Sequence, residues 1–143
     1  MNYIKNYYDF IIEGVISNFD KNINIKFRID ADDHFYDRLS RNDNEPDLNG
    51  NIPIDETEVI SDIKLALPEI TRKTLFSNGI HWDNIKRNNL SSDILIKNVN
   101  SKLNTLLSIS KEKFTYVVTV KTVMRKSDFR SSYKEKTIEV ILR

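Results

Sequence analysis

The fold is decided by the stretch Phe114-Thr115-Tyr116-Val117-Val118-Thr119-Val120-Lys121-Thr122-Val123-Met124-Arg125. It is the longest run of alternating residues in the chain and is rich in β-branched and aromatic side chains, which favour extended backbone. We predict from it a long central strand. Strict alternation places Thr119, Lys121 and Arg125 on one face of that strand. This face is either the ordinary solvated side of a half-buried strand or the floor of a cleft in which Lys121 and Arg125 bind phosphate.

Further strands are predicted on both sides of this stretch. In the C-terminal half we expect strands at residues 93–99, 102–110 and 137–142, separated by short turns. Nearer the N-terminus, residues 22–29 alternate between isoleucine or phenylalanine and polar side chains, which predicts one more strand.

The remaining N-terminal segments have helical spacing. Apolar residues between positions 3 and 19 recur about every 3.6 residues, which predicts an amphipathic helix. Aspartates at 30–33 are placed to cap a short helix, and Asp55 to begin a longer one that Pro68 ends or kinks. We therefore expect an α+β fold in a single domain, residues 1–143. Its N-terminal helices would pack on one face of a four- or five-stranded antiparallel sheet.

Composition excludes several classes of function but does not select a single one. The chain has no cysteine, which excludes disulfides and thiolate chemistry, and no apolar run long enough to span a membrane. The formal net charge is +1, yet residues 30–69 carry net −9 and residues 70–143 net +9, with histidines neutral. Either the two parts attract each other, or the C-terminal part presents a basic surface to a polyanion.

A short polar stripe carries the most chemistry. In a helix, the segment His34-Phe35-Tyr36-Asp37-Arg38-Leu39-Ser40-Arg41 places His34, Asp37, Arg38 and Arg41 on one face and offers Phe35 and Leu39 to the core. Histidine exchanges protons near neutral pH, and arginine binds phosphate oxygens through paired hydrogen bonds. Such a face can cleave RNA without a metal, with a base at the 2′-hydroxyl and cations at the charged transition state. A solvated helix face with an Asp37–Arg41 ion pair is the alternative interpretation.

Other residues are candidates for binding RNA. Trp82, which follows His81, can stack on a base, although a single tryptophan is also a typical core residue. Lys102, Lys121 and Arg125 are candidates for holding phosphates. The sequence has no glycine-rich phosphate loop, and its aspartate cluster at residues 30–33 suits helix capping better than metal binding. We expect neither a metal nor a cofactor.

These motifs together resemble a family. A helix with the pattern H-x-x-D-R-x-x-R, a following helix with Ile54-Asp55-Glu56-Thr57-Glu58-Val59, and then a multi-stranded sheet are similar to the RelE-like ribonucleases. More broadly, they resemble the barnase–EndoU–colicin–RelE group. The segments Ser101–Asn104 and Thr122–Phe129 also resemble small proteins of T4-like phages.

The resemblance implies a function and a location. It implies metal-independent cleavage of messenger RNA, with His34 and Arg38 as the catalytic positions, in a host cytoplasm or a virion. Proteins of this group also occur as inactive or virion-associated forms. The alternative is therefore a non-enzymatic phage virion or assembly component, a head, neck or tail protein that binds other phage proteins. The oligomeric state stays open.

Overall fold

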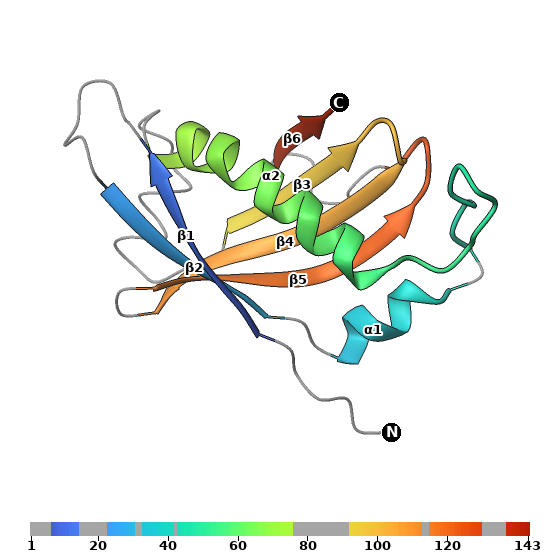
Figure 1. Ribbon diagram of the computed structural model, residues 1–143, viewed down its shortest axis with the longest axis horizontal. Helices are drawn as coiled ribbons and strands as arrows, with labels where there is room; N and C mark the ends of the chain where they lie inside the picture. The colour runs from blue at the N-terminus through green and yellow to red at the C-terminus, as the bar shows by residue number, and fades with distance from the viewer. Residues whose placement is uncertain are drawn as a thin grey trace.

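The computed structural model describes residues 7–14, 23–30, 33–41, 43–75, 92–112, 115–129 and 137–143. They form one six-stranded sheet in the order β1-β2-β5-β4-β3-β6, with a long helix lying across one face (Figure 1). The elements in chain order are β1 (Tyr7–Gly14), β2 (Ile23–Asp30), α1 (Asp33–Leu39), α2 (Glu56–Leu75), β3 (Ser92–Asn98), β4 (Leu103–Glu112), β5 (Thr115–Arg125) and β6 (Ile138–Leu142).

The predicted arrangement of N-terminal helices on an antiparallel sheet is wrong. The segment expected to form the first helix contains β1, which pairs antiparallel with β2 along its whole length. Its sequence, YYDFIIEG, is aromatic and β-branched, so it suits a strand once a partner strand is available. A short apolar run fits both the spacing of a helix and the alternation of a strand, and here the pairing with β2 decides for the strand. Both helices of the described residues follow this pair of strands.

The sheet is mixed because two of its pairings join strands that are distant in sequence. β2 runs parallel to β5, and β3 runs parallel to β6, whereas the other three pairings are antiparallel. Parallel neighbours need a long crossover, and both helices together with β3 and β4 lie between β2 and β5 along the chain. Periodicity within a strand carries no signal for such a crossover.

The predicted long central strand is confirmed. β5 is the longest strand of those described and pairs with β2 on one side and β4 on the other. The strict alternation along it is wrong, because the register with β4 skips Lys121: Leu106 lies opposite Thr122 and Leu107 opposite Val120. This β-bulge adds one residue to β5. The side chains after Lys121 therefore lie on the face opposite to the one that strict alternation predicts. Val123 therefore joins the buried core, and Arg125 is buried as well, whereas Lys121 is exposed.

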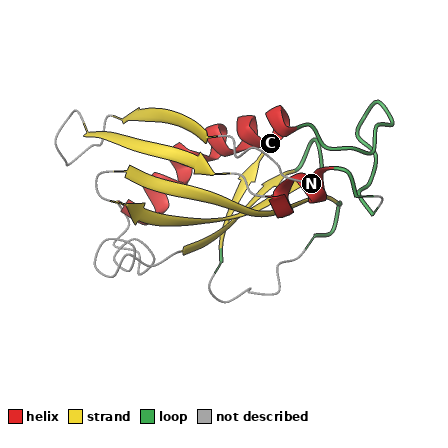
Figure 2. Ribbon diagram, turned by 90° about the horizontal axis from the view of Figure 1, so that it is seen from below, coloured by secondary structure: helices red, strands yellow, loops and turns green. Residues whose placement is uncertain are grey.

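The core lies between α2 and the face of the sheet that α2 covers (Figure 2). α2 buries one apolar stripe: Val59, Ile60, Ile63, Ala66, Leu67 and Ile70. Asp55 begins the helix, since its carboxylate accepts the N–H of Thr57 at 3.0 Å, as expected for a cap. Pro68 does not end the helix, which continues to Leu75. The apolar stripe continues to Ile70 past this exposed proline, so burial outweighs the one backbone hydrogen bond that proline removes.

Candidate functional site

Three segments meet at the C-terminal end of β5, and Asn44 joins them. Its side-chain nitrogen donates to the carbonyl oxygens of Arg38 at 3.3 Å and Arg41 at 3.1 Å, at the end of α1. Its side-chain oxygen accepts the backbone N–H of Arg125 at 2.9 Å. Glu45 adds a backbone hydrogen bond to the Arg125 carbonyl at 2.7 Å. A buried amide that satisfies three backbone groups fixes the position of the loop that begins here.

The Arg125 guanidinium lies beside this loop and forms a two-point ion pair with Glu58. Its two terminal nitrogens donate to the two carboxylate oxygens of Glu58 on α2, at 2.9 and 2.7 Å. One of them also donates to the Ser101 carbonyl at 2.8 Å. The side chain of Arg125 has no exposed surface, and its Nε has no hydrogen-bond partner. The hydrogen bonds to Glu58 raise the pKa of Arg125 above its usual value, so the cation persists at every physiological pH.

A second carboxylate lies one turn further along α2. Asp62 is buried, and its Oδ1 accepts the side-chain N–H of Asn98 at 3.0 Å, while its Oδ2 has no hydrogen-bond partner. Burial raises the pKa of Asp62 above its usual value, because the charged form loses water there. Asn98 in turn accepts the backbone N–H groups of Asn100 and Ser101, both at 3.1 Å, and so shapes the turn between β3 and β4.

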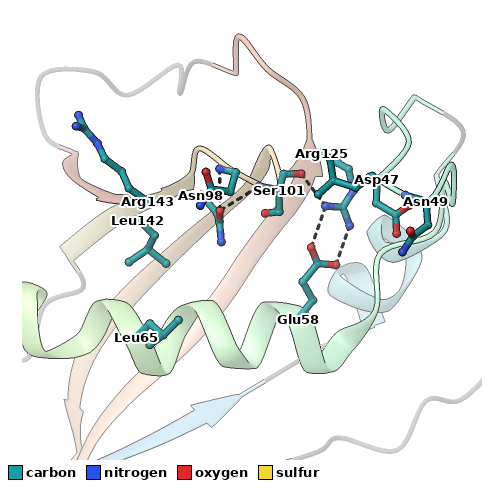
Figure 3. Close-up of a pocket in the computed structure, with 11 residues that line it drawn as sticks. Asp47, Asn49, Glu58, Leu65, Asn98, Ser101, Arg125, Leu142 and Arg143 are labelled. Atoms are coloured by element: carbon teal, nitrogen blue, oxygen red, sulfur yellow. Dashed lines mark hydrogen bonds and ion pairs between the residues drawn. The ribbon is translucent and has the colours of Figure 1, made fainter.

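Glu58, Arg125, Asn98 and Ser101 line a hollow of about 470 Å³ (Figure 3). Its walls are the 47–49 loop, α2, the 98–101 turn and the end of β6. Leu48 on this loop and Leu65 on α2 both line it, with 88% and 64% of their surfaces exposed. The volume lies within the range typical of ligand sites. The hollow is therefore a concave surface with apolar side chains at its rim and a neutralised ion pair inside it.

The loop that carries Leu48 is tightly hydrogen-bonded. The Asp47 carboxylate accepts the backbone N–H groups of Asn49 at 2.8 Å and Asn51 at 2.9 Å. These bonds, above all that from Asn51, lower the pKa of Asp47. The Asp47 carbonyl accepts the N–H of Gly50, whose φ of +83° is a conformation that glycine adopts without strain. Leu48 is thus held out by a preformed turn.

The predicted RNA-binding cations differ in exposure and in their partners. Lys121 is exposed and donates to Asp93 on β3 at 2.8 Å, and the bulge at Lys121 puts Arg125 on the buried face instead. Lys102 lies in the turn before β4 with a φ of 63°, and its side chain is exposed. Arg41 pairs with Asp43 at 3.4 Å. The expectation that Arg125 shares a polar face with Lys121 is therefore wrong.

The predicted catalytic stripe is placed only in part. α1 forms as expected, with Phe35 buried in the core, Leu39 packed against it and Arg38 half-buried. His34 lies on α1 one turn before Arg38, and its side chain is outside the described residues. Trp82 and His81 also lie outside the described part of the chain.

Sequence reasoning missed Asp62, Asn44 and the pairing of Glu58 with Arg125. Asp62 had a visible signal, since it occupies a core position in the spacing of Val59, Ile63 and Ala66 on α2. A carboxylate at such a position needs a partner from elsewhere in the fold. The contact of Glu58 with Arg125 spans 67 residues, and nothing local indicates it.

No protein-family model, no curated protein and no solved structure matches the chain. Neither described helix is long and apolar enough to cross a membrane. Within the described ranges, no group of three or more histidine, aspartate or glutamate side chains is arranged to hold a metal ion.

Proposed function

We propose that this protein is a non-enzymatic interaction component that binds a partner protein over the hollow. The observation that carries the proposal is that both terminal nitrogens of Arg125 are bound to the Glu58 carboxylate. A ribonuclease needs cations that are accessible to phosphate where charge develops. Here both cations of β5 are bound to carboxylates, and a phosphate at Arg125 would have to displace a two-point ion pair whose arginine has no exposed surface.

The rim of the hollow supports the same proposal. Large apolar side chains exposed around a concave surface are typical of protein interaction sites. The preformed turn holds Leu48 in one place, so binding loses little conformational entropy there. The resemblance to small proteins of T4-like phages then points to another phage protein as the partner, in the particle or during its assembly.

The experiment is a comparative affinity capture. Tagged wild-type protein and a Leu48→Asn/Leu65→Asn variant are incubated with an extract of the source, and the bound proteins are quantified by mass spectrometry. We expect a partner that wild type retains and the double variant loses. Ile52→Asn is the matched control, because Ile52 is also an exposed apolar residue of the same loop but does not line the hollow. Equal retention by wild type and the double variant would contradict the proposal.

We propose an endoribonuclease as a second candidate, supported by the position of His34 and Arg38 four residues apart on the single helix α1. Under this proposal, purified protein cleaves total RNA in EDTA and leaves 2′,3′-cyclic phosphate ends. His34→Ala should then lower the rate roughly 10²–10⁴-fold. Cleavage that is undiminished in His34→Ala would indicate a contaminant, and no cleavage by wild type would remove this candidate.

A further inference from the structure

β6 is an edge strand with an apolar sequence. It is the last strand in the sheet order, and its five residues, Ile-Glu-Val-Ile-Leu, include a single charge. Exposed edges usually carry lysine, proline or a bulge that prevents pairing with another chain. Ile141 keeps 50% of its surface exposed. Among the described residues, no strand pairs with β6 on the side away from β3.

The backbone groups that face outward follow from the pairing with β3. The Leu142 carbonyl accepts the N–H of Val99 at 2.9 Å, so the backbone of Leu142 faces inward to the sheet. Because successive residues of a strand direct these groups to opposite sides, Val140 also faces β3. The N–H and C=O groups of Ile141 therefore face outward, where an extended strand can satisfy them in register.

We propose that β6 pairs antiparallel with β6 of a second copy of this chain, with Ile141 opposite Ile141 of that copy. Two identical edges related by a two-fold axis form a closed dimer with a continuous sheet. An Ile141 pair that exchanges two hydrogen bonds is the arrangement that outward-facing groups at this residue require. The exposed side chains of Ile141 then pack on each other across the axis.

Charge complementarity selects this register and this occupant. With Ile141 on the axis, Glu139 lies opposite Arg143 of the second copy, and Arg143 lies opposite Glu139 of that copy. The dimer thus gains two cross-strand pairs of opposite charge. Glu139 can share its carboxylate with Lys97, since their contact is 3.6 Å long and the Glu139 side chain is 53% exposed. On the other face, Val140 lies opposite Leu142 of the second copy, so apolar side chains also match.

The first test uses backbone chemistry. Sedimentation velocity of wild type across a range of concentrations should show a dimer, whereas Ile141→Pro should sediment as a monomer with unchanged circular dichroism. Proline at this position removes an outward N–H and is tolerated at an edge strand. A wild type that is monomeric throughout, or a dimer that survives in folded Ile141→Pro, overturns the proposal.

The second test is independent of any folding defect in the proline variant. Arg143→Glu alone and Glu139→Arg alone each place like charges across the axis, and each should weaken self-association roughly tenfold. Mixed together, the two variants bring opposite charges into both positions and should associate as well as wild type does. Failure of the mixture to associate overturns the register. Leu48→Asn/Leu65→Asn should leave the dimer intact, which separates this proposal from partner binding at the hollow.

Discussion

Removing Glu58 should destabilise the protein, because it leaves Arg125 as a buried charge without its counter-ion. Glu58→Ala leaves the fully buried Arg125 guanidinium without its carboxylate and removes two charge-assisted hydrogen bonds of 2.9 and 2.7 Å. Breaking a buried pair on one side costs about 3–5 kcal/mol. Because the Glu58 side chain is 29% exposed, water can enter, and we expect a loss of about 3 kcal/mol.

The assay is urea unfolding followed by circular dichroism, with the slope m held as a check on two-state behaviour. Glu58→Ala/Arg125→Met replaces the pair by an apolar side chain and should regain about 2 kcal/mol of the lost stability relative to Glu58→Ala. Ser61→Ala is the control for truncation of an exposed residue on α2. The reasoning fails if Glu58→Ala loses less than about 1 kcal/mol, or if the double variant is no more stable than Glu58→Ala.

Three further substitutions in the same part of the fold should change the stability of the protein or its pH dependence. The pKa of Asp62 is raised, so the folded state binds this proton more tightly and wild type loses stability as pH rises from the ordinary value of 3.8 through the raised one. Asp62→Asn should remove this pH dependence in urea unfolding, and an unchanged profile would show that another group titrates. Asn44→Ala deletes three hydrogen bonds and leaves the buried N–H of Arg125 unsatisfied, so calorimetry should show a loss of about 2–3 kcal/mol. Asp55→Ala removes the cap of α2 and should lower the unfolding midpoint, whereas Asp55→Ser should retain most of it.

Patterns within one segment predict the elements that form as their own apolar spacing indicates, whatever strand or helix they pack against. The patterns predict β5 and α1 close to where they form, and they predict that α2 begins at Asp55. The segment that contains β1 was misassigned, because its apolar spacing suits a helix and a strand alike, and only the pairing with β2 separates the two.

The candidate site was predicted less well, for reasons that operate over long distances in sequence. The bulge at Lys121 reverses the sides of β5, so Arg125 enters the core instead of sharing a polar face with Lys121. Whether a strand contains a bulge depends on its register with β4, which alternation in β5 does not reveal. Leu48 lies among polar residues in the sequence, and its place at the hollow depends on how Asn44 attaches its loop to β5.

The sequence by itself determined the long strand at the centre, the apolar stripe of α2 and the short helix with His34, because each depends on spacing within one segment. The tertiary structure alone decided the mixed sheet order, the burial of Arg125 against Glu58 and the position of β6 at the edge. Each of these depends on contacts between residues far apart in the chain. Such contacts form only when the loss of chain entropy is offset by burial and hydrogen bonding, and no local pattern encodes that balance.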